Sequence, residues 1–284
     1  MTRLELRYGD LWLALAPELG GSVLSFRLGD LDLLRPTPAG AADVLETACF
    51  PLVPFANRIA EGRFTWGGRT AAIPANMTGQ AHPLHGDGWL GAWRVEGVDA
   101  RSCVLEFMPE RSAWPWRYSA AQSVRLSEQG LTLTLSVTNL DDAAGPFGLG
   151  FHPYFPDSAT ARLTATTRGV WEASDELLPV RERAEAPWQE GRAVRSDVLL
   201  DHCHTGWSGE AAIVLGAGKP ALRLTASRAL RWLHVYVPPD GDFFCVEPVS
   251  HAPNALNMDD PHGHGVWTLE PGQTGVAWMH LDLA

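Results

Sequence analysis

The chain has 284 residues, of which 45% are hydrophobic and 19% charged, and this composition excludes an intrinsically disordered protein. Its formal net charge is −11, and no run of Lys or Arg supplies the basic footprint that a nucleic-acid partner requires. Because all-β sandwiches and barrels often reach this length as one unit, we expect residues 1–284 to form a single domain.

The first ten residues alternate apolar and polar side chains and lack the continuous apolar segment of a secretory signal. No later apolar run is long enough to span a membrane. We therefore expect no membrane partner and a cytoplasmic location. The cysteines follow no short metal or disulfide spacing, so we expect them to be reduced and mostly buried. They are Cys49, Cys103, Cys203 and Cys245.

Short alternating runs predict strands along most of the chain. Leu131–Thr138 alternates apolar and hydroxyl residues without a break, as a strand with one buried and one wet face does. No segment has a long 3.6-residue periodicity, so the predicted fold class is all-β, a sandwich. The other predicted strands are bounded by Gly, Pro, Asp or Asn; in chain order they are Leu4–Tyr8, Leu11–Leu15, Val104–Met108, Ala221–Ala226, Trp232–Val237 and Val276–Leu283.

Residues 172–198 interrupt this pattern. The stretch is rich in Glu, Ala and Arg and contains two prolines. We interpret it as a long surface excursion between strands, and a linker between two domains is the alternative. The chain has no internal repeat of fixed period, which disfavours a propeller or a solenoid.

Two segments in the first third of the chain combine a stiff backbone with side chains that bind ligands. Asn57 and Arg58 follow two prolines, and the planar Arg58 guanidinium can donate to the hydroxyls of a ligand or pair with a neighbouring acid. Gly62–Trp66 then returns as a strand. His85 lies in a turn-rich loop, where its imidazole either faces a ligand or has no function at the surface.

Two later segments frame one imidazole and one carboxylate with aromatic residues and proline. Pro153 biases His152 toward an extended backbone, and an ordinary imidazole pKa of about 6.5 suits proton transfer at neutral pH. Glu247 lies in an apolar stretch where an unpaired charge is costly. We interpret the two as an acid and a base. The alternatives are a core histidine bonded to a backbone carbonyl and a buried salt bridge between Glu247 and Arg58.

Three close histidine pairs raise the question of a metal site. None of them comes with a carboxylate or a third ligand at a recognisable spacing, so we predict that the protein binds no metal. The pairs are His82 with His85, His202 with His204, and His262 with His264.

Taken together, five segments resemble the aldose 1-epimerase (galactose mutarotase-like) family in order and spacing, over a region from about residue 10 to the C-terminus. They are Asn57–Ile59, Leu84–Gly86, Gly150–Phe155, Asp201 and Val246–Pro248. The resemblance implies the family's large antiparallel β-supersandwich, which agrees with the strand pattern. One departure is visible: the family often has two glycines after the first histidine, whereas this chain has Gly86-Asp87-Gly88.

The resemblance also implies site residues and an activity. His152 matches the family's general acid and Glu247 its general base, while the positions that match its sugar-binding residues are Asn57, Arg58, His85 and Asp201. The implied reaction interconverts the α and β anomers of a neutral aldose by ring opening and closure, without a cofactor or a metal. The implied partner is a small sugar, and a monomer and a homodimer are both open.

Two other functions fit the same fold. A hexose-6-phosphate 1-epimerase would need several clustered cations, and the key motifs contain only Arg58 and Arg63 nearby. A non-catalytic sugar-binding domain would need hydroxyl partners but no acid–base pair, so the presence of both His152 and Glu247 argues against it.

Overall fold

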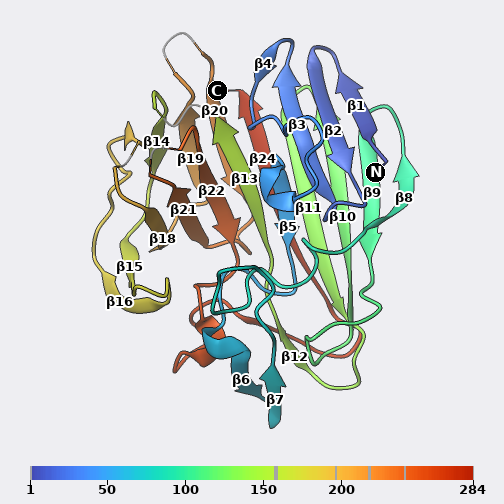
Figure 1. Cartoon of the computed structure of the whole chain (residues 1–284), viewed down its shortest axis with the longest axis vertical. Coiled ribbons are helices and arrows are strands. Elements are labelled where there is room, and N and C mark those ends of the chain that lie inside the picture. The colour runs from blue at the N-terminus through green and yellow to red at the C-terminus, as the bar shows by residue number, and fades with distance from the viewer. Residues whose placement is uncertain (1, 157–158, 196, 217–218, 240, 284) are drawn as a thin grey trace.

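The computed structural model describes residues 2–156, 159–195, 197–216, 219–239 and 241–283, which form two large antiparallel sheets (Figure 1). The strands of the eleven-stranded sheet are, in spatial order, β1 (Leu4–Tyr8), β2 (Leu11–Ala16), β3 (Ser22–Leu28), β5 (Cys49–Leu52), β13 (Gly150–Pro156), β22 (Phe243–Val249), β21 (Trp232–Val237), β18 (Leu200–Thr205), β15 (Gly169–Ala173) and β16 (Pro179–Arg183), with β4 (Leu31–Asp32) paired to β3.

The second sheet has nine strands. In spatial order they are β17 (Arg192–Ala193), β14 (Arg162–Ala165), β19 (Glu210–Val214), β20 (Ala221–Ala226), β24 (Thr274–Leu283), β11 (Gly130–Asn139), β10 (Tyr118–Ser127), β9 (Ser102–Phe107) and β8 (Arg94–Val98). Two small sheets complete the fold; they pair β6 (Arg63–Trp66) with β7 (Arg69–Ala72) and β12 (Gly145–Phe147) with β23 (Trp267–Leu269).

Helical structure in the described residues is confined to three-residue 3-10 turns. These are η1 (Val44–Glu46), η2 (Ala60–Gly62) and η3 (Ala255–Asn257). None of the described helices has the length and apolar character needed to cross a membrane. The predicted all-β fold class, an antiparallel sandwich, is therefore confirmed.

The predicted strands are confirmed, and the interpretation of residues 172–198 needs a correction. The predicted runs Leu4–Tyr8, Ala221–Ala226 and Trp232–Val237 have the observed bounds, and the other predicted strand ends differ by a few residues. The stretch 172–198 was expected to be a surface excursion but includes β16 and β17, which pair at the sheet edges. Because most of their side chains are exposed on both faces, these strands lack the apolar alternation that marks half-buried ones.

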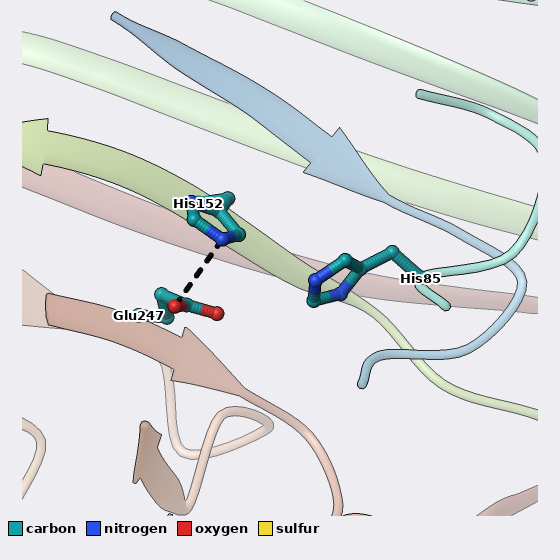
Figure 2. Close-up of side chains that lie close together, drawn as sticks. All are labelled: His85, His152 and Glu247. Atoms are coloured by element: carbon teal, nitrogen blue, oxygen red, sulfur yellow. Dashed lines mark ion pairs between the residues drawn. The ribbon is translucent and has the colours of Figure 1, made fainter. Parts of the chain in front are cut away.

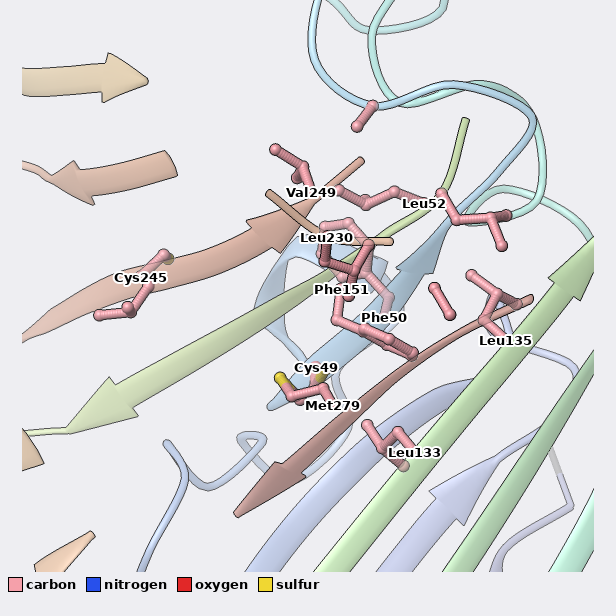
Figure 3. Packing of buried hydrophobic residues seen from close by; sticks show 14 of the residues in the cluster. Cys49, Phe50, Leu52, Leu133, Leu135, Phe151, Leu230, Cys245, Val249 and Met279 are labelled. Atoms are coloured by element: carbon pink, nitrogen blue, oxygen red, sulfur yellow. The ribbon is translucent and has the colours of Figure 1, made fainter. Parts of the chain in front are cut away.

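Hydrophobic side chains from both sheets join in one buried cluster. Figure 3 shows part of it, with Phe151 from β13, Leu133 from β11 and Met279 from β24. The four cysteines are buried and form no disulfide, in agreement with the prediction. The expectation of a single domain over residues 1–284 remains a prediction.

Strand β13 shows how this core positions functional groups. Successive side chains of a strand point to opposite faces, so Phe151 and Phe155 lie on one face and His152 and Tyr154 on the other. Residues Gly150 to Phe155 are all buried, because both faces of this part of the sheet are covered. The backbone that carries His152 is therefore held from two sides.

Leu133 tests the contribution of this core to stability. Its side chain is 1% exposed on the inner face of β11, and Leu133→Ala would leave a cavity between the sheets. We expect the free energy of unfolding to fall by about 2–5 kcal/mol, as measured by urea denaturation. Thr134→Ala, on the outer face of the same strand, is the matched control. Equal losses for the two variants would contradict the assignment of Leu133 to the core.

Candidate active site

The register of three neighbouring strands places three candidate side chains level on one face of the large sheet. Gly150 pairs with Val249 and Tyr154 with Cys245, so His152 on β13 stands opposite Glu247 on β22. His234 on β21 is the register partner of Glu247 on its other side. Directly paired residues share a face of the sheet, and the three side chains therefore line one pocket.

Figure 2 shows His152 and Glu247 in contact, with the His85 ring beside them. His152 Nε2 lies 3.3 Å from Glu247 Oε1, and both side chains are buried. The imidazole of His152 packs against two rings, with centroid distances of 4.6 Å to Phe50 and 4.7 Å to Tyr154. These contacts fix the plane of the imidazole and aim Nε2 at the carboxyl group.

Burial favours the neutral form of both members of this pair. It lowers the pKa of His152 to about 3, an effect increased by the charge of His234. It raises the pKa of Glu247 to about 8, against the lowering effect of the His234 charge. At neutral pH the pair therefore holds one proton, which Glu247 carries.

His85 reaches the pocket from a loop with unusual backbone geometry. His85 and Gly86 have φ values of +59° and +74°, and a Cβ on residue 86 would meet Val53 O at 2.1 Å, so this position needs glycine. The Asn57 backbone N–H donates to His85 Nδ1 at 3.0 Å, and the His85 backbone N–H donates to Asn57 O at 3.0 Å. Burial keeps the pKa of His85 well below its usual value, so the neutral ring carries its hydrogen on Nε2.

Potential ligand atoms of His85, His152 and Glu247 all lie within 4.8 Å of one another, close enough to surround a metal ion. The tautomer of His85 does not suit that role. Its Nδ1 accepts the Asn57 N–H, and its Nε2 therefore carries hydrogen and has no lone pair for a metal. The three side chains together fit a site of proton exchange better than a metal site.

The histidine pairs noted in the sequence have structural partners. His82 Nδ1 accepts the Glu61 backbone N–H at 3.1 Å, and His204 Nε2 accepts the Trp188 indole N–H at 3.0 Å. His262 Nδ1 bonds the Val266 carbonyl at 3.1 Å. These contacts explain one member of each pair without a metal.

Arg58 pairs with Asp201 in the same pocket. Arg58 Nη1 lies 3.3 Å from Asp201 Oδ2, and Arg58 Nη2 donates to Gln80 Oε1 at 3.3 Å. The backbone N–H of Arg58 donates to Asn57 Oδ1 at 2.9 Å, which orients the Asn57 amide. The alternative of a salt bridge between Glu247 and Arg58 is therefore wrong, because the guanidinium is directed at Asp201.

His234 and Gln80 are polar residues of the pocket that the sequence analysis missed, and His234 has the more central position. Its Nε2 contacts Asp201 Oδ1, and its Nδ1 lies 3.5 Å from Asn57 Nδ2. Burial alone would lower the pKa of His234, but Asp201 outweighs this effect and raises it. Burial alone would raise the pKa of Asp201, but His234 and Arg58 hold it at about 2. The sequence contains one signal for this role. His234 is a polar residue inside the otherwise largely apolar predicted strand Trp232–Val237, on the same face as Tyr236.

Asp87, which departs from the family pattern, makes its hydrogen bonds outside the pocket. Its carboxyl group accepts hydrogen bonds from the hydroxyls of Tyr118 and Ser112. It is not among the residues that line the pocket. The acidic residue next to Gly86 therefore adds no charge to the surroundings of His85 in the pocket.

The pocket has a volume of about 370 Å³, which is within the usual size of small-molecule sites. It contains all six predicted site residues together with His234. Its less buried part is largely apolar and includes Leu45, Met77, Leu177 and Leu199. The arrangement provides a buried imidazole–carboxyl pair, several hydrogen-bonding groups around it and an opening bordered by apolar side chains.

Comparisons with known proteins identify the family of the chain. The family model described as Aldose 1-epimerase matches residues 2–282. The chain is 33% identical over 292 residues to the uncharacterized protein YphB of Escherichia coli K12, covering 99% of this chain and 98% of that protein.

Solved structures extend the likeness to three dimensions. A crystal structure of a protein from Escherichia coli K12 has a TM-score of 0.93 and 31% identity, covering 100% of this chain and 99% of that one. A galactose mutarotase-like protein from Clostridium acetobutylicum shares the fold, with a TM-score of 0.86 and 21% identity over 99% of this chain and 94% of that one. The chain belongs to the aldose 1-epimerase family.

Proposed function

We propose that the protein is an aldose 1-epimerase that interconverts the α and β anomers of a neutral aldose. The observation that carries the proposal is the contact of 3.3 Å between His152 Nε2 and Glu247 Oε1 inside a pocket of sugar size. Anomer exchange requires one proton to leave the C1 hydroxyl and one to reach the ring oxygen. A buried pair that holds a single exchangeable proton can perform both transfers.

The reaction balances with these two side chains. With Glu247 as carboxylate and His152 as imidazolium, Glu247 takes the proton of the C1 hydroxyl. The C1–O5 bond breaks, its electron pair goes to O5, and His152 gives its proton to O5. Rotation about C1–C2 turns the aldehyde. His152 then takes the O5 proton, O5 attacks the other face of C1, and Glu247 returns its proton to the C1 oxygen.

The sugar-free form of the pair matches a state of this cycle. After ring opening Glu247 is protonated and His152 is neutral, which are the forms that burial favours in the empty pocket. The arrangement needed for ring opening contains the same number of protons, so the pair only has to move one proton between its members. The ratio of the two arrangements therefore does not change with pH.

The surrounding groups fit the remaining hydroxyls of a sugar. His85 presents an Nε2–H donor, and Arg58, Asn57 and Gln80 present further polar groups. Holding the hydroxyls would leave rotation about C1–C2 as the main freedom of the open-chain sugar. Asp201 has both carboxylate oxygens engaged, by His234 and by Arg58, so we assign it to the support of these two side chains.

The lining of the pocket favours a neutral aldose over a phosphorylated one. Arg58 is the one Lys or Arg among the described residues that line it, and its charge is paired with Asp201. A phosphate binds best to several donors with uncompensated positive charge. The apolar outer part of the pocket offers none.

Substitution of Glu247 tests the proposal. Glu247→Gln keeps the shape but cannot accept a proton, so we expect sugar binding to persist while kcat falls by roughly 10²–10⁴-fold. The readout is saturation-exchange NMR on a panel of aldoses at equilibrium between their anomers. His152→Gln should behave alike, and the double variant should lose far less than the product of the two losses.

Glu190→Gln, an exposed glutamate, is the control for this series and should keep the parent rate. If Glu247→Gln abolishes binding but leaves kcat within a few-fold of the parent where it can be measured, Glu247 is a hydroxyl anchor. The non-catalytic sugar-binding function would then be favoured.

The pH dependence of kcat/KM tests the one-proton pair. Raising the pH through about 8, the pKa of Glu247, removes that proton, so we expect activity to fall there. Lowering the pH adds a second proton to His152 only near about 3, well below the ordinary histidine range. The measurement is polarimetry with the buffer-catalysed rate subtracted. Activity that rises through pH 8 would contradict the assignment.

The phosphate preference is measured by comparing a hexose with its 6-phosphate. We expect kcat/KM for the neutral sugar to be at least tenfold higher, because the pocket offers no uncompensated cation. Leu45→Ala serves as a control, because it changes the outer part of the pocket without adding charge. Faster turnover of the 6-phosphate by the parent protein would establish the phosphosugar activity instead.

A further inference from the structure

Arg35 lies directly behind the wall of the pocket. It follows β4 in the chain and is not itself among the residues that line the pocket. Its guanidinium carbon Cζ is 3.8 Å from the centroid of the Tyr154 ring and 4.5 Å from that of the Phe243 ring. Its Nη2 donates to the Leu45 carbonyl oxygen at 2.5 Å. These three partners all line the pocket.

Further hydrogen bonds connect Arg35 to two segments at once. Its Nη2 also donates to Thr47 O at 2.7 Å, so the guanidinium binds the η1 turn at two carbonyls. The backbone N–H of Arg35 donates to Tyr154 O at 2.8 Å, which binds the same residue to β13. Arg35 therefore connects a turn at the outer part of the pocket with the strand that carries His152.

The Arg35 guanidinium carries its charge without an acidic partner. Among the described residues no carboxylate forms an ion pair with it, and carbonyl oxygens and ring faces surround it instead. An arginine side chain stays protonated in proteins, and a charge withdrawn from water needs such contacts in place of its hydration. The guanidinium and the pocket wall therefore stabilise each other.

The orientation of His152 depends on packing. A catalytic imidazole is usually oriented by a hydrogen bond to its second nitrogen, but no other described residue supplies a partner to His152 Nδ1. The ring instead stacks on Tyr154, with 4.7 Å between the centroids and 27° between the planes. The Tyr154 hydroxyl makes no hydrogen bond within the described residues either, so the position of this ring depends on its packing, including that on Arg35.

We propose that Arg35 is a positioning residue of the candidate active site, whose guanidinium keeps the Tyr154 ring packed on the His152 imidazole. This role rests on the proposed epimerase function. Arg35 does not touch the reacting pair and acts through the Tyr154 ring. The result of this packing is the direction of His152 Nε2, which lies 3.3 Å from Glu247 Oε1.

Arg35→Met tests the proposal by turnover. Methionine keeps an unbranched apolar side chain but removes the charge and both hydrogen bonds of the guanidinium. Because proton transfer depends on the exact placement of the imidazole, we expect kcat to fall by roughly 10–100-fold. The value of KM should stay within a few-fold of the parent, since Arg35 contributes no group to the pocket lining. Both constants come from saturation-exchange NMR over a range of sugar concentrations.

Arg27→Met is the matched control. Arg27 on β3 also places its guanidinium carbon over an aromatic ring, 4.2 Å from the Trp12 ring centroid, and it is half-buried, as Arg35 is. Neither Arg27 nor Trp12 lines the pocket. This substitution should leave both kcat and KM at the parent values.

A double-mutant cycle tests whether the effect passes through Tyr154. Tyr154→Leu removes the ring on which both Arg35 and His152 pack. If Arg35 acts through this ring, its substitution should cost little more once the ring is gone. The double variant should then lose about as much kcat as Tyr154→Leu alone. Losses that multiply would overturn the proposal, because the two residues would then act independently.

The NMR signals of the His152 ring report its position without turnover. The centroids of the Phe50 and Tyr154 rings lie 4.6 and 4.7 Å from that of His152, so their ring currents shift its C–H proton signals. In the sugar-free protein Arg35→Met should move these signals, and Arg27→Met should not. Unmoved signals in Arg35→Met would overturn the proposal even if kcat falls, and so would an unchanged kcat.

One observation needs only the parent protein, in case Arg35→Met does not fold. The Arg35 side-chain protons next to the guanidinium should resonate upfield of their usual positions, because the Tyr154 and Phe243 rings lie under it. Signals at the usual positions would overturn the proposal. If the parent epimerises no aldose, the proposed function fails, while the His152 signals still decide whether Arg35 positions the imidazole.

Discussion

The contact between His152 and Glu247 depends on the desolvation that the two sheets impose on it. Exposed to water, the carboxyl group would be ionised at neutral pH with a pKa of ~4.3, and the imidazole would titrate with a pKa of ~6.5. In this protein the core seals the inner face of β13 and β22, and a shell of aromatic rings covers His152 on the other face. Each neutral form is then favoured, and one proton remains on the pair.

The other polar side chains of the site are paired with one another, which offsets the free-energy cost of burying them. Asp201 is neutralised by Arg58 and His234, so a carboxylate, a guanidinium and an imidazole form one connected group. Asn57 links this group to the His85 loop through its backbone and its amide. Buried polar groups are stable only when they have hydrogen-bond or ionic partners, so these contacts depend on the register of the strands.

Much of this arrangement could be predicted from the sequence. The alternation in Leu131–Thr138 and similar runs predicted the fold class, because a strand with one wet face carries a period of two. His152 and Glu247 stood out because a polar side chain framed by aromatic residues and proline is costly without a role. The six residues indicated by the family resemblance do line one pocket, although their roles in binding and catalysis remain proposals.

What the sequence could not supply is the identity of the partners. His234 lies in an apolar strand far along the chain from Asp201, and only the antiparallel register brings the two together. The assignment of Arg58 to Asp201, and not to Glu247, likewise depends on the position of a loop. Asp87 looked like a change in the binding site, yet its loop turns the carboxyl group toward Tyr118 and Ser112. Edge strands β16 and β17 were not predicted. Their side chains are exposed on both faces, so their sequences lack the alternation of apolar and polar residues that indicates a strand.

A structure of the protein with a bound aldose would test the central claim most directly. The account predicts that the sugar lies in the pocket with its C1 hydroxyl within hydrogen-bonding distance of Glu247 and its ring oxygen within reach of His152 Nε2. Asp201 should keep its contacts with His234 and Arg58. A sugar bound with C1 directed away from the pair, or bound outside this pocket, would contradict the account.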